Sequence, residues 1–212
     1  LRTRRQRQMC IRDSDETDPY SKTEIRFVMD RNINEQLTLG ATALYSEEEI
    51  DYDGFNHEFD HIDRTRSAGS IYASFESGSI TNKIKRSFSN TDRYDRNGWN
   101  KSFIGSRDVW NYTGQTIFNG ANVTFGYEES TEEADIDGQI KDYKETAVIS
   151  EVNYALGKNS DISLAARRTS SKNYGDDTTY RLAAINRHQD ELTSRLVSVS
   201  YTHLTLPTSP KV

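Results

Sequence analysis

Apolar side chains recur at every second position along most of this chain. Residues 23–31, for example, place Ile25, Phe27 and Met29 between polar or charged neighbours. Successive side chains of a β-strand point to opposite faces, so each such run predicts a strand with one apolar side. The pattern returns in residues 36–46, 71–75, 80–88, 123–127, 148–154, 162–166 and 180–184. No segment shows a sustained helical period, and the fold class predicted is all-β.

The links between these runs alternate in length. Short links, most of which contain Gly or Asn, fall at 32–35, 77–79, 118–120, 156–160 and 188–192, whereas long polar links fall at 47–66, 91–101 and 132–142 and an intermediate one at 173–178. Gly and Asn tolerate the positive φ of tight hairpin turns. Alternate links of an up-and-down antiparallel sheet lie at opposite ends of the strands. Short turns at one end and long loops at the other are typical of an outer-membrane β-barrel.

The composition agrees with a barrel better than with a packed core. Leu, Ile, Val and Phe form only about a fifth of the 212 residues, whereas Tyr and Phe number 12 and 8. A barrel turns apolar side chains to lipid and polar ones to its lumen, so it needs no oily interior. No run approaches the roughly 20 apolar residues of a spanning helix, and a net charge of −6 argues against a nucleic-acid partner. We therefore expect antiparallel up-and-down strands of a partial transmembrane β-barrel, with about ten strands, in the outer membrane of a Gram-negative bacterium.

The two ends differ from the middle in composition. Residues 1–14 hold five Arg and the only Cys, and residues 199–212 hold two of the three Pro. Both ends resemble translated sequencing-adaptor read-through. We therefore divide the chain into a non-native segment 1–14, a barrel segment 15–198 and a second non-native segment 199–212.

Three stretches of the middle resemble the barrel domain of TonB-dependent outer-membrane receptors, nearest the vitamin B12 and siderophore branch. They are residues 37–55, 106–130 and 162–186, the last of which carries Arg167, Tyr174 and the run Thr178 to Ala183. The resemblance implies a fragment of a transport protein, not an enzyme, that takes up a scarce nutrient. It also implies outer-membrane lipid, a plug domain, TonB and a small nutrient ligand as partners. The plug and the TonB box have no counterpart in these residues.

Two local patterns suggest metal chemistry. His57, Glu58 and His61 fit the H-E-x-x-H motif of zinc proteases, but that chemistry needs a helix, and the residues lie in a predicted acidic loop. The same loop, residues 47–63, carries eight carboxylates that could order around Ca²⁺ or remain solvated: Glu47, Glu48, Glu49, Asp51, Asp53, Glu58, Asp60 and Asp63. We favour the solvated loop. We therefore predict no catalytic, cofactor-binding or metal-ligating residue and no cofactor.

Cations along the strands allow two interpretations. They could guide an anionic substrate through a lumen, or pair with lumen carboxylates and a plug surface, which we prefer; the residues are Lys83, Lys85, Arg86, Arg107, Arg167 and Arg168.

Two alternatives to the receptor remain. One is another outer-membrane barrel, a pore or a surface enzyme, which could be complete with ten strands. The other is a soluble extracellular β-structured binding protein. In a barrel, one outer, convex sheet face should hold Leu37, Leu39, Ile71, Phe75, Val123 and Phe125. In a complete ten-stranded barrel, the first and last strands should pair. In a soluble protein, these apolar side chains should meet in a closed interior.

Overall fold

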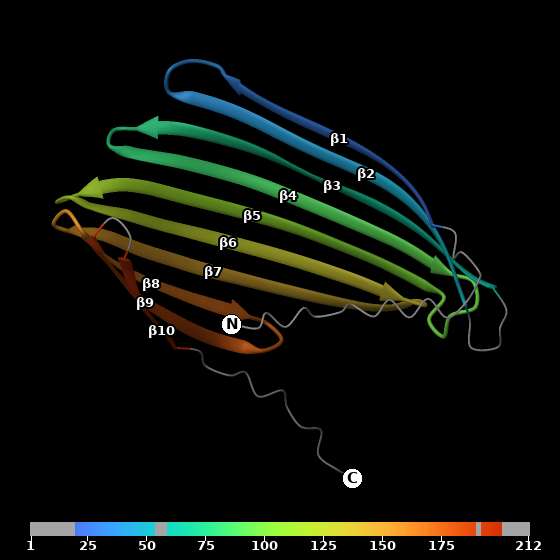
Figure 1. Cartoon of the computed structure of the whole chain (residues 1–212). Helices are drawn as coiled ribbons and strands as arrows, with labels where there is room; N and C mark the ends of the chain where they lie inside the picture. Colours follow the sequence, from blue (N-terminus) through green and yellow to red (C-terminus); the bar gives the residue numbers. More distant parts are fainter. Residues whose placement is uncertain (1–19, 54–58, 190–191, 201–212) are drawn as a thin grey trace, which may run out of the picture.

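The protein forms ten strands in a single antiparallel sheet (Figure 1). A computed structural model describes residues 20–53, 59–189 and 192–200. The strands are β1 (Tyr20–Asn32), β2 (Leu37–Asp53), β3 (Phe59–Ser77), β4 (Ile80–Asp95), β5 (Ser102–Phe118), β6 (Ala121–Ile136), β7 (Gln139–Leu156), β8 (Ser160–Ser171), β9 (Gly175–Gln189) and β10 (Leu192–Ser200). Of the predicted non-native ends, residues 1–14 and 201–212 lie outside the described part, and Val199 and Ser200 end β10.

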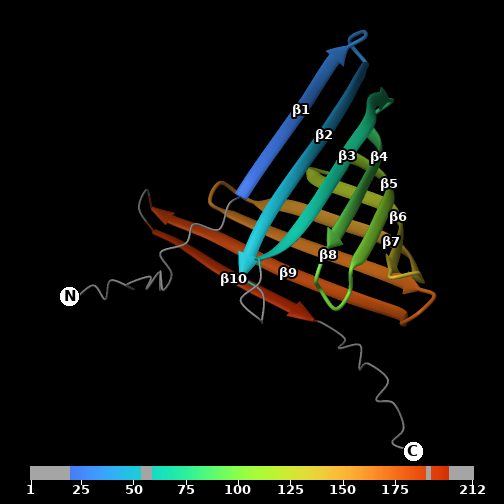
Figure 2. The same cartoon turned by 90° about the vertical axis from the view of Figure 1, so that its right-hand side faces the viewer.

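Each strand pairs with its neighbours in the chain, so the predicted all-β, up-and-down fold is confirmed. Seen from the side, the first and last strands run at a steep angle to each other, and the sheet is strongly curved and twisted (Figure 2). The sheet is not closed: within the described residues β1 and β10 are both edges. The pairing of first and last strands expected of a complete ten-stranded barrel is therefore not found.

The strands are longer, and the links shorter, than the sequence predicts. The predicted long link 132–142 is a two-residue turn in which Asp137 and Gly138 have φ of 51° and 85°. The link after β4 spans residues 96–101, and that after β8 spans 172–174. Near the loop end both faces of the strands are polar, so these parts of the strands show no hydrophobic alternation in the sequence. Backbone pairing between neighbouring strands nevertheless continues there.

The pairing register divides side chains between two faces. Leu37, Ile71 and Val123 fall on one face, together with Leu39, Phe75 and Phe125. These apolar side chains do not meet in a closed interior; Ile71, for example, is 58% exposed. Among the described residues the only buried apolar side chain is Ala147, whereas several buried ones are polar. The described sheet thus lacks the packed apolar interior that a soluble sandwich needs.

The apolar face is crossed by an oblique line of aromatic residues. The pairing places Tyr45 on β2 level with Glu133 on β6, whereas the aromatic residue of β6, Tyr127, lies six residues nearer the short turns. In the same way, Tyr127 is level with Thr178 on β9, whereas Tyr180 lies two residues nearer the short turns. From β2 to β9 the aromatic line thus shifts toward the short turns by about 1.1 residues per strand, or ~3.8 Å for each ~4.8 Å strand spacing. This slope corresponds to a strand tilt of roughly 38°, within the ~35–45° of transmembrane barrels.

Trp110 lies on the same aromatic line. Phe118, on the same face of β5, marks the edge of the apolar surface nearest the short turns. The distance between them is eight residue steps, as it is between Tyr45 and Leu37. Eight steps span ~26 Å along a strand and ~20 Å along the membrane normal at this tilt, close to the ~25 Å band of outer-membrane barrels. We call the surface between these edges the apolar band.

Tyrosine hydroxyls mark where the apolar band gives way to charge. Tyr45 donates a hydrogen bond to Glu47 (2.6 Å), and Tyr127 donates one to Glu129 (3.2 Å). In both pairs the carboxylate is two residues nearer the loop end on the same face. A ring in apolar surroundings with its hydroxyl on a charged group is suited to a lipid–water boundary. The band thus occupies the short-turn half of the sheet, and the loop-end halves extend beyond it.

Close packing keeps aromatic rings flat against this face. The ring of Phe125 lies over Gly114, where an added Cβ would come within 2.4 Å of it. None of the described residues forms a helix that is long and apolar enough to cross a membrane.

The two faces predict effects of different size for the same added charge. We expect Val123→Arg, in the apolar band, to lower the free energy of unfolding in phospholipid vesicles by about 2–4 kcal/mol. Thr124→Arg, one residue along on the polar face, should change it far less. Urea titration followed by tryptophan fluorescence measures both, and equal effects would contradict the assignment of faces.

Candidate functional site

The face opposite the apolar band carries ion pairs between strands. Arg107 Nε lies 3.0 Å from Glu132 Oε1 on the neighbouring strand. Arg167 Nη2 reaches across β7 to Glu128 Oε1 at 3.0 Å and also contacts Glu145 Oε1 at 3.3 Å. Each of these half-exposed ion pairs contributes little to the free energy of folding. Together they form a charged, hydrated surface. We call this surface the polar face.

Cations and carboxylates are unevenly distributed on the polar face. By register, strands β3, β4 and β5 carry three carboxylates, Asp60, Glu76 and Asp95, and six cations, Arg64, Arg66, Lys83, Lys85, Arg93 and Arg107. Strands β6, β7 and β8 carry two cations, Lys141 and Arg167, and five carboxylates, Glu128, Glu132, Glu145, Glu151 and Asp161. The face therefore has a basic side and an acidic side that follow one another around the curve of the sheet.

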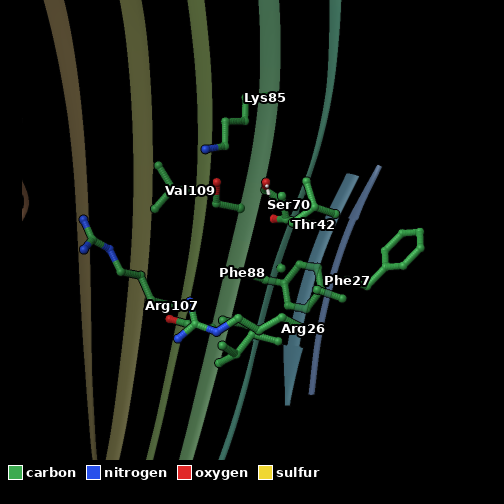
Figure 3. A pocket seen from close by; sticks show the side chains of 15 residues that line it. Arg26, Phe27, Thr42, Ser70, Lys85, Phe88, Arg107 and Val109 are labelled. Atoms are coloured by element: carbon green, nitrogen blue, oxygen red, sulfur yellow. Dashed lines mark hydrogen bonds between the residues drawn. The ribbon is translucent and has the colours of Figure 1, made fainter. Parts of the chain in front are cut away.

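A hollow of about 500 Å³ lies on the basic side (Figure 3). Its floor is the backbone around Gly69, and small polar side chains surround it, including Thr42 and Ser70, whose hydroxyls hydrogen-bond at 2.9 Å. The rings of Phe27 and Phe88 point to the other face. Sequence reasoning missed this hollow; the signal was the run of small residues at polar-face positions of neighbouring strands.

Three cations surround the hollow: Arg26, Lys85 and Arg107. Arg26 pairs with Glu24, and Arg107 pairs with Glu132. Lys85 has no ion pair within the described part of the chain. The hollow is consequently a positively charged, water-accessible depression that suits a small anion or the anionic group of a larger solute.

The structure divides the cations of the sequence analysis between the faces. Lys83 and Lys85 lie on the polar face with Arg107 and Arg167, and the Lys83 ammonium sits 4.2 Å from the centre of the Tyr72 ring. Arg86 and Arg168 lie on the opposite face. Arg86 pairs with Asp108 at 2.8 Å and Arg168 with Asp176 at 3.0 Å. Pairing with carboxylates, the preferred interpretation, thus describes Arg107 and Arg167.

The zinc-protease pattern does not form its site. His57 and Glu58 lie outside the described residues, and His61 lies on strand β3 rather than on a helix. Its Nδ1 contacts Asp51 on the paired strand, and its Nε2 lies 2.8 Å from Asp63 Oδ1. Both ring nitrogens therefore face carboxylates.

The predicted acidic loop is largely strand, and its carboxylates alternate between the two faces. Glu47, Glu49 and Asp51 lie on one face of β2, whereas Glu48 lies on the other and pairs with Arg64. In residues 20–53, 59–189 and 192–200, no three His, Cys, Asp or Glu side chains are grouped to hold a metal ion.

No protein-family profile and no curated protein matches the sequence. Two similar solved structures come from Vibrio cholerae. One is OmpT with its loop L8 deleted, an outer-membrane protein, at 10% identity and a TM-score of 0.43, covering 80% of this chain and 87% of that one. The other is in-vitro folded OmpT, at 9% identity and a TM-score of 0.41, covering 81% of each chain.

The oblique apolar band fits the outer-membrane location that the sequence predicts. Neither comparison supports a TonB-dependent receptor specifically. The prediction that the chain is not an enzyme is also corrected. It rested on the receptor resemblance alone, which neither comparison supports, and we do not retain it.

The carboxylates around His61, which lies beyond the apolar band, predict a pH response. Hydrogen bonds first to Asp51 and then to Asp63 raise the pKa of His61 above its ordinary 6.5. The stabilisation by the imidazolium is thus fully present below pH ~6.5 and is lost as the pH rises through the higher, folded-state pKa. We expect Asp51→Asn to lower this pKa, as followed by NMR titration of the imidazole in detergent. Asp60→Asn, on the other face, should leave it unchanged; a wild-type pKa at or below 6.5 would refute the geometry.

Proposed function

We propose that this chain forms part of the wall of an outer-membrane β-barrel pore that passes small polar solutes. The observation that carries the proposal is the division between faces. The apolar band suits lipid, while the polar face has charged, half-exposed side chains and water-accessible hollows. A surface of that kind suits a wet lumen.

Polarity of the lumen face supports passage of solutes rather than structural packing alone. Small side chains, such as those of Thr42, Ala68 and Ser70, line the hollow, which leaves space above the sheet. The basic and acidic sides place opposite charges on different parts of the wall. A solute with both charges, or a small anion near Lys85, would find partners there.

Uptake by a TonB-dependent receptor is the second candidate. Its support is the resemblance of residues 37–55, 106–130 and 162–186 to that family. In such a receptor the ion-paired polar face would lie against a plug domain instead of open water. Recovery of the complete gene discriminates the two: an upstream plug-coding segment would favour the receptor.

Conductance tests the pore directly. Reconstituted into planar bilayers, the protein should give discrete steps of ionic current. Lys85→Glu should move the reversal potential in a KCl gradient toward cation preference, since it replaces the unpaired cation at the hollow with an anion. Arg86→Gln alters the next residue, which faces lipid, and should leave the reversal potential unchanged. Absence of current from correctly folded protein would rule the pore out.

A further inference from the structure

We propose that the link between β4 and β5, residues 96–101, presents Trp99 as a stacking surface for a sugar ring outside the membrane. This inference goes beyond the proposed pore and does not depend on it, because conductance requires the polar face and not this link.

The exposure of Trp99 is the first observation. Its side chain is 104% exposed, whereas Trp110, the other tryptophan, lies on the aromatic line at 47%. Tryptophan is highly buried on average, because its ring offers a large apolar area. A fully exposed indole is therefore a candidate binding surface for a ligand.

Position excludes the membrane anchor as the explanation. Ser102, where β5 begins, lies eight residues from Trp110 toward the loop end. Eight residues correspond to ~26 Å along the strand and ~20 Å along the membrane normal at a tilt of roughly 38°. Trp99 precedes Ser102 in the link and so stands about 20 Å or more from the aromatic line, outside the boundary at which tryptophan anchors proteins to lipid.

The residues around Trp99 are fixed on both sides. Asp95, which is 8% exposed, accepts hydrogen bonds from the Gly98 amide (2.9 Å) and the Tyr52 hydroxyl (3.0 Å). The Arg96 amide donates to the His61 carbonyl at 3.1 Å.

On the other side, the Lys101 amide donates to the Asp137 carboxylate at 3.2 Å. The Ser102 amide donates to the same carboxylate at 2.8 Å. Strands β2, β3 and the β6–β7 turn therefore hold the link from both directions. Such preorganisation lowers the entropy cost of binding.

The chemistry beside the ring favours a saccharide. Asn97 is engaged with Asp60 and Arg96 with Asp63. Asn100 and Lys101 follow Trp99 directly in the sequence and carry an amide and an ammonium. A pyranose offers a C–H face to an indole, and hydroxyl or acidic groups to such donors. The outer leaflet of a Gram-negative outer membrane displays sugar headgroups, and free polysaccharide offers the same chemistry.

Intrinsic fluorescence of the full chain provides the test. Trp110→Phe leaves Trp99 as the single indole, in protein refolded into phosphatidylcholine vesicles. The probes are the core oligosaccharide released from lipopolysaccharide, maltohexaose, and vesicles that contain intact lipopolysaccharide. We expect a blue shift and protection from acrylamide quenching with at least one probe. A response to lipopolysaccharide vesicles alone identifies the headgroup as the source, and a response to a soluble probe identifies free saccharide.

Variants of the link separate stacking from folding. In saturation-transfer NMR with the responding probe, Trp99→Ala should weaken binding by about tenfold or more, while Trp99→Phe, which keeps a ring, should stay within about threefold. The Tyr180→Phe control alters an aromatic residue at the lipid boundary and should bind normally. No response to any probe up to roughly 10 mM, or quenching of Trp99 by brominated acyl chains, would overturn the proposal.

Discussion

Backbone hydrogen bonding is the constraint on which this structure depends. A chain in lipid cannot leave N–H and C=O groups unpaired, because no water replaces the missing partner. Each internal strand here pairs on both sides for most of its length. That ladder, rather than an apolar core, holds the sheet together, which explains why a single buried apolar side chain among the described residues is enough. Side chains are then free to be sorted by their surroundings.

The two faces solve different problems with one register. On the apolar band, glycine under an aromatic ring, as at Gly114 and Phe125, keeps the surface flat. On the polar face, arginines reach across strands to carboxylates, as Arg167 does to Glu128. Neither arrangement would be stable on the other face. A charged side chain in the apolar band would lose its hydration, and an aromatic ring in a wet lumen would not be removed from water.

How far the sequence predicts this structure differs between its parts. Period two is a local signal, so strands such as that of Leu37 and Leu39 could be located from residues alone, as could the face that carries the apolar side chains. Strand ends could not, because both faces become polar beyond the band and residues 132–142 look like a loop. The hollow beside Lys85 depends on five neighbouring strands, β1 to β5, which a local pattern does not bring together. Trp99 matters only through its exposure, which composition does not encode.

The two-residue spacing of Tyr45 and Glu47, repeated at Tyr127 and Glu129, gives the bilayer a part in selecting the fold. Sliding one strand past its neighbour by the smallest step that preserves its faces would carry a carboxylate down to the level of the tyrosine ring. In water such a slip would cost little free energy, since the backbone hydrogen bonds form again after it. In a bilayer the displaced charge would enter the hydrocarbon layer, so the membrane destabilises misaligned strands during insertion.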